Sequence, residues 1–487
     1  MNWRGVFFLL GRLLLALTAA LLVPAVVALY YKSGEHTAFL ISAGVSGIAG
    51  LILQTRFSDG LANDKFGRSE AFVLVAAAWG TASLAGALPW IVLEGSGFWV
   101  NAIFESVSGF TTTGASILTD IEARGPAILL WRSLTQWLGG MGIIVLGIAV
   151  LPKLAVGGLE LLGAEAPGPI KEKLTPRIAQ TAKALWGIYA LLTLIEVTAL
   201  VLAGMGLFDA VNHAFATMAT GGFSTLNSSV SGFASPLIEW IIIVFMILAG
   251  ANFALHFHLL RGKPGPLLQD REFRYYVSIM ALATSLICAD LMLRAQQEMS
   301  LLDAFRDAAF QAVAITTTTG FATADFELWP AFSRALLFLL MFIGGCAGST
   351  GGSIKVVRIM ITVKKLVIDL KRKVQPHAVL PVRIGPTAVP DDVVNSVTTF
   401  LLLFVALFAA GGLLLTMLGI DPTTAFSASA ACIANVGPGF GDVGPTLNYG
   451  GLPATAKLIL LGLMLVGRLE LYTLLVLLFL RRGRRKA

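Results

Sequence analysis

Charged residues are scarce in this chain. Only 13% of its 487 residues are Asp, Glu, Lys or Arg, about half of the roughly 25% that soluble proteins carry. Hydrophobic residues make up 56%, and they gather in runs close to the ~20 residues that a helix needs to cross a bilayer. This balance excludes a soluble multidomain protein, and it predicts an all-α polytopic membrane protein.

Cysteine is almost absent as well. Cys288, Cys346 and Cys432 lie far apart in the sequence, so neither a disulfide framework nor a Cys/His metal site is expected. The net charge of +7 could indicate a nucleic-acid partner. However, the cations lie in short gaps between apolar runs and not on basic faces. We therefore expect no nucleic-acid binding, and we expect membrane lipids around the chain.

Ten apolar runs predict ten membrane spans. They cover residues 6–31, 37–54, 71–93, 126–151, 184–206, 236–260, 275–293, 331–361, 393–418 and 454–480. An even number of spans puts both termini on one side of the membrane. Most of the 35 Lys and Arg residues lie in the connections of that side, which the positive-inside rule assigns to the cytoplasm.

An internal fourfold repeat occupies four of the outer connections, at residues 99–116, 207–225, 305–323 and 421–441. When Gly114, Gly222, Gly320 and Gly437 are aligned, the residues thirteen positions earlier are Asn101, Asp209, Asp307 and Thr424, each followed by Ala. Asn, Asp and Thr are favoured helix N-caps, so a half-helix of two to three turns is expected before each glycine. Irregular backbone at membrane depth must be buried in protein or line a water-filled path. Four such returns predict one shared pore with pseudo-fourfold symmetry.

The repeat also predicts the organisation of the chain. A two-helix hairpin at residues 1–69 is followed by four units of span, pore helix and span. These units cover residues 70–182, 183–272, 273–391 and 392–487.

The residues at each return fit a filter for a monovalent cation. A half-helix that ends at mid-membrane directs its negative dipole end towards the axis, and the backbone oxygens after it can replace a hydration shell. No ring of Asp or Glu is present, which argues against a filter for divalent cations. The predicted filter residues are Thr112, Thr113, Gly114, Thr220, Gly221, Gly222, Thr318, Thr319, Gly320, Asn435, Val436 and Gly437.

These motifs carry a resemblance that covers essentially the whole chain. The residues at 109–114, 220–225, 317–323 and 435–439, with Gln136–Gly142 and Gly344–Gly352, resemble the Trk/Ktr/HKT superfamily of potassium uptake proteins. Within it, the leading hairpin makes the chain most similar to the bacterial Trk membrane subunit. The resemblance implies K⁺ as the transported ion, no organic cofactor, a homodimer and a cytosolic nucleotide-binding regulatory subunit. It also implies a bacterial inner-membrane location.

In this superfamily the glycine of the first repeat goes with potassium, whereas a serine goes with sodium in some plant relatives. Gly114 occupies that position here and implies potassium. In the second repeat Gly221 and Gly222 compete for the filter position. We favour Gly222, because Phe223 then matches Phe321.

A glycine-rich segment from Gly344 to Ser353 interrupts one apolar run. A phosphate-binding loop is disfavoured because the spacing to Lys355 does not match, which leaves a helix-packing kink or a flexible gate below the filter. The resemblance favours the gate. Its expected residues are Gly344, Gly345, Gly348, Ser349, Gly351, Gly352, Lys355 and Arg468.

Arg468 lies within the last apolar run, where an arginine costs at least about 2.5–3.5 kcal/mol to insert. It is expected either to oppose cations on the inner side of the pore or to form a buried ion pair with Glu196 or Glu470.

The gate segment continues into Lys364, Lys365 and Lys371–Lys373. This basic stretch could be a topological signal, could face lipid, or could bind the regulatory subunit.

The sequence therefore predicts K⁺ uptake driven by the membrane potential, which supplies about 2.3 kcal/mol per charge per 100 mV. Two alternatives remain. One is a symporter that couples K⁺ to Na⁺ or H⁺. The other is an intramembrane hydrolase, in which Ser349 or Ser353 would need a facing His or Lys base.

Overall fold

The chain is almost entirely helical. The computed structural model describes residues 2–58, 68–149, 174–294 and 299–471. Within these ranges the only sheet is a hairpin in which β1 (Arg383–Ile384) pairs antiparallel with β2 (Thr387–Ala388), with Arg383 opposite Ala388. The prediction of an all-α polytopic protein is confirmed.

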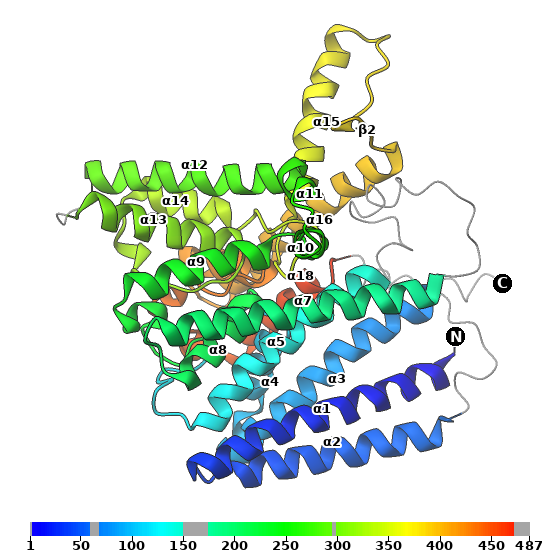
Figure 1. Ribbon diagram of the computed structural model, residues 1–487, viewed down its shortest axis with the longest axis vertical. Helices are drawn as coiled ribbons and strands as arrows, with labels where there is room; N and C mark the ends of the chain where they lie inside the picture. The colour runs from blue at the N-terminus through cyan, green and yellow to red at the C-terminus, as the bar shows by residue number, and fades with distance from the viewer. Residues whose placement is uncertain (1, 59–67, 150–173, 295–298, 472–487) are drawn as a thin grey trace.

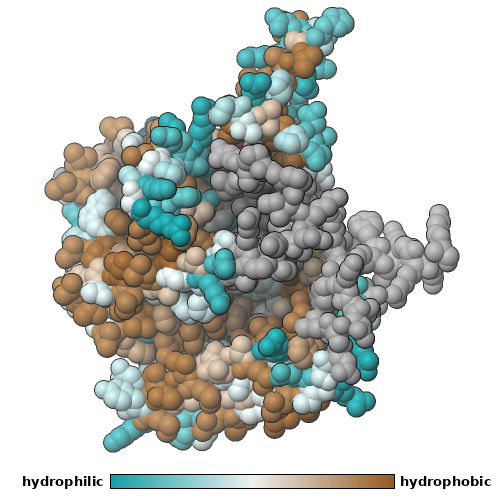
Figure 2. Space-filling view, turned by 45° about the vertical axis from the view of Figure 1, so that its right-hand side comes forward, coloured by the Kyte–Doolittle hydropathy of each residue, from teal (hydrophilic) through white to brown (hydrophobic). Residues whose placement is uncertain are grey.

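Six described helices are long and apolar enough to cross a bilayer. They are α1 (Trp3–Tyr31), α2 (His36–Arg56), α3 (Arg68–Glu94), α7 (Leu174–Leu202), α12 (Arg271–Arg294) and α16 (Asp391–Met417). In Figure 1, α1, α2, α3, α7 and α12 run across the picture in roughly the same direction. Large apolar side chains such as Leu40, Ile48, Leu194 and Leu402 are exposed on these helices. Brown side chains accordingly cover much of the face in Figure 2, as expected for a surface in contact with lipid.

The remaining predicted spans are interrupted or only partly described. Residues 126–149 form α5 (Pro126–Ala149), whereas the run at 236–260 is a bent pair, α9 (Pro236–Gly250) and α10 (Phe253–Leu260), that meets at 105°. The run at 331–361 is not one helix, because α14 (Ala331–Leu340) ends early and fifteen residues separate it from α15 (Val356–Val374). The last run is helical as α18 (Ala454–Arg468), and residues 472–480 lie outside the described part.

Four shorter helices lie between pairs of spans. They are α4 (Trp99–Phe110), α8 (Leu207–Met218), α13 (Leu301–Thr316) and α17 (Pro422–Ile433). The element orders α3–α4–α5, α7–α8–α9, α12–α13–α14 and α16–α17–α18 are called repeats 1 to 4 below. The alanines aligned in the sequence, Ala102, Ala210, Ala308 and Ala425, are completely buried, so the short helices form the centre of the molecule.

Short elements complete the chain. The helix α11 (Gly265–Gln269) precedes α12, and single 3₁₀ turns occur at η2 (Ser96–Phe98), η4 (Ser229–Phe233), η5 (Phe326–Leu328), η6 (Gly441–Val443) and η7 (Tyr449–Gly451).

The leading hairpin is joined to repeat 1 by a buried carboxylate. Gly11 and Gly50 allow α1 and α2 to pack closely, since a Cβ on Gly11 would lie 2.9 Å from the Gly50 carbonyl oxygen. In the turn between them, Glu35 accepts hydrogen bonds from Ala127 N (3.0 Å) and Ile128 N (3.3 Å). A carboxylate at the start of α5 is favoured by the helix dipole. The hairpin is thereby anchored to α5.

Candidate functional site: four returns around one axis

The four short helices end at the same point of the repeat. Phe110, Met218, Thr316 and Ile433 each lie four residues before the aligned glycine. The three residues up to and including each glycine, 112–114, 220–222, 318–320 and 435–437, are called the return segments. They contain all twelve residues that the sequence singled out as a filter.

Each short helix ends in the same backbone turn. Thr112, Thr220, Thr318 and Asn435 adopt left-handed conformations with φ of 52°, 53°, 61° and 55°. The next residue then donates a hydrogen bond five residues back, as in Thr113 N to Ser108 O (2.9 Å) and Val436 N to Ala431 O (2.8 Å). This is the Schellman termination, which usually has Gly at the left-handed position. A β-branched threonine there is a conformational outlier, so the same costly geometry is kept in three repeats.

The aligned glycines close a ring around one axis. Their φ values are 81° (Gly114), 75° (Gly222), 75° (Gly320) and 99° (Gly437). A Cβ on each would overlap a carbonyl oxygen of the next repeat, in the order Gly114 with Gly221, Gly222 with Thr319, Gly320 with Val436, and Gly437 with Thr113. Because this order returns to its start, the four segments meet at a common centre, and glycine is required both for its φ and for the close approach.

The structure separates the two glycines of repeat 2. Gly222 has the positive φ and the ring contact of its counterparts, as the sequence alignment favoured. Gly221 lies instead against Gln136 of α5, because a Cβ there would lie 2.7 Å from Oε1 and 2.8 Å from Nε2. Each glycine is thus required for a different contact.

The predicted N-caps are wrong by several residues. The helices begin after Phe98, Gly206, Ser300 and Asp421, so Asn101, Asp209 and Thr424 lie in the first turn and Asp307 in the second. These side chains bind elsewhere, and Asp209 accepts a hydrogen bond from Thr225 Oγ1 (2.6 Å). The repeat could be recognised because these four residues lie at the same distance before the aligned glycine, although they are not the N-caps of the short helices.

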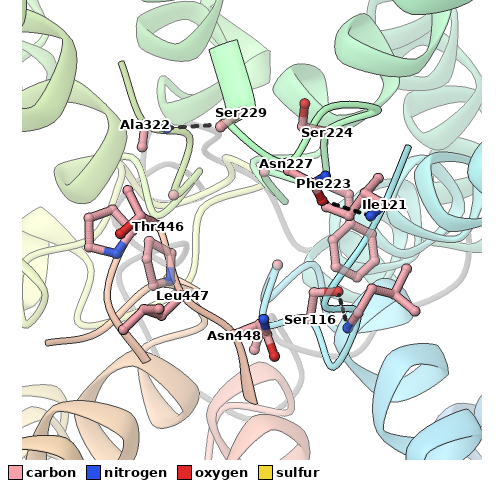
Figure 3. Close-up of a pocket in the computed structure, with 18 of the residues that line it drawn as sticks. Ser116, Ile121, Phe223, Ser224, Asn227, Ser229, Ala322, Thr446, Leu447 and Asn448 are labelled. Atoms are coloured by element: carbon pink, nitrogen blue, oxygen red, sulfur yellow. Dashed lines mark hydrogen bonds between the residues drawn. The ribbon is translucent and has the colours of Figure 1, made fainter. Parts of the chain in front are cut away.

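A cavity of about 110 Å³ lies beside the ring, among the loops that follow the return segments. It is lined by all four aligned glycines and by residues of the loops that follow them, which surround it in Figure 3. These loops are hydrogen bonded from one repeat to the next, by Ile121 N to Asn227 Oδ1 (2.7 Å), Ala322 N to Ser229 Oγ (3.2 Å), Gly441 N to Glu327 Oε1 and Tyr449 N to Ser116 O (2.8 Å). The loops that follow the return segments therefore form a second closed ring.

This second ring of loops carries negative charge. Asn227 Nδ2 donates to Asp120 Oδ1 (3.2 Å), and this hydrogen bond lowers the pKa of the Asp120 carboxyl. Glu122 accepts from Asn227 N (3.0 Å). Fixed carboxylates at a mouth raise the local concentration of cations.

The glycine-rich segment packs against the ring of return segments. Between α14 and α15, Thr350 Oγ1 donates to Met218 O (3.0 Å) at the end of α8. Gly352 N donates to Thr318 Oγ1 (2.7 Å) in the return segment of repeat 3, and a Cβ on Gly352 would lie 3.0 Å from Asn435 Cβ of repeat 4. The segment therefore contacts three of the four repeats next to the axis.

The remaining glycines of this segment fit the same close packing. A Cβ on Gly344 would overlap the Gly352 carbonyl oxygen, and one on Gly345 would lie 2.7 Å from Gly250 O. Gly348 has a φ of 77°, and Gly351 O accepts a hydrogen bond from Lys355 Nζ.

Arg468 binds the segment and forms no ion pair among the described residues. Its Nη1 donates to Thr350 O (2.8 Å), and the side chain is buried. Glu470, one of the two carboxylates considered as its partner, pairs instead with Arg358. Neither Glu470 nor Glu196 has a salt bridge to it, so the ion-pair interpretation of Arg468 is not supported.

Sequence reasoning missed a buried ion pair behind the ring. Arg132 Nε lies 2.8 Å from Glu105 Oε1, and both side chains are almost fully buried. Arg132 also donates to Ser224 O (3.0 Å) of repeat 2, and its guanidinium lies 4.1 Å above the Phe223 ring. A Glu within a pore-helix segment and an Arg within an apolar run were the available signals.

The two serines considered as nucleophiles of a hydrolase, Ser349 and Ser353, are not placed for that reaction. The Ser349 hydroxyl donates to Cys346 O (2.7 Å) and the Ser353 hydroxyl to Met341 O (2.7 Å). In the part of the chain that the structure describes, neither is bonded to a His or Lys side chain. No group of three or more His, Cys, Asp or Glu side chains is placed to hold a metal ion in that same part.

The fold and the site together define a multi-pass α-helical membrane protein in which four re-entrant returns meet on one axis. The family model described as the cation transport protein TrkH matches residues 48–482. The chain therefore belongs to the TrkH family of cation transport proteins, and it is a transporter and not an enzyme.

Individual relatives are similar to this chain over nearly its full length. The Trk system potassium uptake protein TrkH of Vibrio parahaemolyticus is 41% identical, over 98% of this chain and 99% of the relative. TrkG of Escherichia coli, also named a Trk system potassium uptake protein, is 35% identical over 97% of each chain. The crystal structure of the potassium transporter TrkH from Vibrio parahaemolyticus superposes with a TM-score of 0.89 at 38% identity, covering 98% of this chain and 99% of the other.

Proposed function

We propose that this protein carries K⁺ into a bacterial cell across the inner membrane, along the axis where the four return segments meet. The names of the relatives, which are potassium uptake proteins, support the ion. The observation that carries the proposal is the closed ring of four glycines, each in contact with a carbonyl of the next repeat. In this proposal such a ring would offer backbone oxygens from all four repeats to one ion.

In this proposal the return segments form the selectivity filter. Four short helices end beside it, and their partial negative charges favour a cation there. The carbonyl groups of residues 112–114, 220–222, 318–320 and 435–437 would replace water around K⁺. The closed hydrogen-bonded ring of the outer loops would keep the filter from widening.

The gate would be the glycine-rich segment between α14 and α15. It contacts repeats 2, 3 and 4 directly below the return segments, so an ion could pass only after it has moved. Thr350, held by Arg468 and by Met218 O, is the point at which the segment is tied in place. The buried charge of Arg468 would add an electrostatic barrier.

We further propose the assembly and orientation of the protein. The hairpin 1–69 and the four units 70–182, 183–272, 273–391 and 392–487 would be its domains, with both termini in the cytoplasm. The helix α15 projects beyond the rest of the molecule in Figure 1, across the direction of the spans. Its exposed Leu366 and Leu370, next to exposed lysines, suit contact with a second copy or with a cytosolic nucleotide-binding subunit.

The test is the Na⁺ to K⁺ permeability ratio of the purified protein in liposomes. Gly320→Ser should raise this ratio by about tenfold or more, equivalent to ~1.4 kcal/mol, because its Cβ would overlap Val436 O. Gly419→Ser is the control, since Gly419 also has a positive φ (83°) but has no atom near its Cβ position. An unchanged ratio for Gly320→Ser would remove the return segments from the filter.

Proton-coupled symport is a second candidate because of Glu196. This residue of α7 is fully buried, and neither carboxylate oxygen accepts a hydrogen bond from a described residue. The neighbouring Thr217 hydroxyl donates to His213 O (2.8 Å). A shift of the reversal potential with pH that disappears in Glu196→Gln would establish coupling. A reversal potential set by K⁺ alone would establish a channel.

A further inference from the structure

The four return segments are supported in two different ways that alternate around the axis. In repeat 1 the Thr111 and Thr113 hydroxyls are hydrogen bonded at 2.7 Å, and in repeat 3 the Thr317 and Thr319 hydroxyls are bonded at 2.8 Å. The equivalent pairs in repeats 2 and 4 are Ala219 with Gly221 and Ala434 with Val436. These residues have no hydroxyl, so repeats 2 and 4 lack the internal support.

In repeat 2 the missing support comes from Gln136 of α5. Its Nε2 donates to Gly221 O at 2.7 Å, and its Oε1 accepts from Phe223 N at 3.2 Å. The amide thus bridges the residues on both sides of Gly222, and the side chain is completely buried. Two consecutive glycines rotate at little cost, so this bridge constrains the most flexible of the four segments.

In repeat 4 the support comes from Tyr449, which lies after the return segment. Its hydroxyl donates to Gly437 O at 2.7 Å, while its backbone N donates to Ser116 O at 2.8 Å in repeat 1. The ring is buried and contacts Phe104 at 5.6 Å between centroids. One residue therefore connects a glycine carbonyl of the return segment to the hydrogen-bonded ring of the outer loops.

We propose that Gln136 and Tyr449 are positioning residues that determine ion selectivity, by bonding one carbonyl each in repeats 2 and 4, the two repeats that lack the threonine pair of repeats 1 and 3. This inference rests on the proposed potassium filter. A carbonyl with a side-chain donor keeps one orientation, whereas a free peptide can rotate. Rotation of one carbonyl loosens the ring around K⁺ and reduces the penalty for the smaller Na⁺.

The same proposal explains why repeat 2 has two glycines. Gly222 is needed for the ring, and Gly221 is needed because any Cβ would displace the Gln136 amide. Gly221→Ala should then have the same consequence as removing the Gln136 amide. The two changes should not be additive, because they break one interaction.

The experiment measures Na⁺ and Rb⁺ permeability relative to K⁺ in liposomes that contain the full chain. Gln136→Met keeps the length of the side chain without its donor, and Tyr449→Phe removes only the hydroxyl. Each should raise the Na⁺ to K⁺ ratio by about three- to tenfold, as expected for one buried hydrogen bond. Trp137→Phe is the matched control, since it removes a hydrogen bond to Thr193 Oγ1 (3.1 Å) from the next residue of α5.

A double-variant cycle completes the test. Gln136→Met with Gly221→Ala should be no less selective than either single variant, whereas Gln136→Met with Tyr449→Phe should show the product of the two effects. Wild-type selectivity in both single variants, or an equal loss in Trp137→Phe, would overturn the proposal. If Gly320→Ser still lost selectivity in that case, the filter itself would stand and only the positioning role would be rejected.

Discussion

A buried charged side chain needs a partner of opposite charge, because burial removes it from water. Glu105 and Arg132 are withdrawn from both water and lipid, and their partners come from repeats 1 and 2. The Glu105 carboxylate also accepts from Ser116 Oγ (3.0 Å) and Ile117 N (3.0 Å), so all of its charge is compensated. Such a pair orders the segments around it, because neither charge has an alternative partner.

Removal of one charge of this pair should be severe. Glu105→Gln or Arg132→Met should lower stability by about 3–5 kcal/mol, because the other charge stays buried without its partner. The loss of stability would be measured by heating the protein in detergent and recording the temperature at which its monodisperse elution peak disappears. The double variant Glu105→Gln with Arg132→Met should recover part of it, and an additive loss would show that the two residues act separately.

Threonines at left-handed positions are the least expected residues of the site. Each costs on the order of 1–3 kcal/mol relative to glycine, and the cost is offset by the packed helices around them. Thr318 uses this conformation to accept a hydrogen bond from Gly352 N. The strained residue of the return segment therefore also contacts the segment below it.

At the scale of the elements, the segment between α14 and α15 is held by individual hydrogen bonds to its neighbours and not by a helix of its own. It replaces a stretch of spanning helix, and side-chain and backbone bonds to other elements hold it, including Cys346 N to Gly250 O (2.8 Å) and Arg468 Nη1 to Thr350 O. Bonds of this kind can be exchanged one by one, whereas a continuous helix opens cooperatively.

We expect Arg468→Ala to raise K⁺ flux severalfold in the absence of any partner. The substitution removes both the bond to Thr350 and a buried positive charge close to the axis. Ion flux into liposomes would report it. Arg468→Lys separates the two contributions, because it keeps the charge and should retain most of the barrier. A loss of thermal stability in Arg468→Ala without any gain in flux would reject the barrier.

At the scale of the whole molecule, the described residues form a ring of four repeats, with the leading hairpin anchored to repeat 1 and α15 projecting beyond the rest. The helix α15 leaves the ring with Val363, Leu366, Leu370 and Val374 exposed along one face. Lys364 donates to Arg383 O (2.6 Å) of β1, and Lys365 donates to Thr398 Oγ1 (3.0 Å) of α16. These two lysines therefore hold α15 to its neighbours. The exposed end of α15 at residues 371–373, called the tip below, is left for contact with other chains.

A docking role of this tip can be tested without unfolding it. Lys371→Glu with Lys373→Glu reverses exposed charges and leaves Lys364 and Lys365 in place. The variant should lose at least about tenfold in affinity for a nucleotide-binding partner in pull-down from native lysate, since a like-charge contact opposes association. Basal flux of the purified variant should be unchanged. Nucleotide-responsive flux from the purified parent protein alone would contradict the need for a separate partner.

The repeat, the pore helices and the aligned glycines could be predicted because they depend on local properties. Apolar runs report burial in lipid, and Gly at a fixed distance after a helix reports a backbone that no other residue adopts cheaply. The preference for Gly222 over Gly221 used the same local signal, and Gly222 has the positive φ of its counterparts. The helix starts were misplaced because Asn, Asp and Thr suit the first turn as well as the N-cap.

The contacts that complete the site could not be predicted, since they join distant parts of the chain. Asn435 Nδ2 donates to Thr113 Oγ1 (2.9 Å) across 322 residues, and Gln136 reaches Gly221 across 85. The sequence by itself determined that four glycine-containing returns exist and that they belong within a membrane. Their order around the axis, and the side chains that hold each carbonyl, depend on which helices pack together, and only the folded chain specifies that packing.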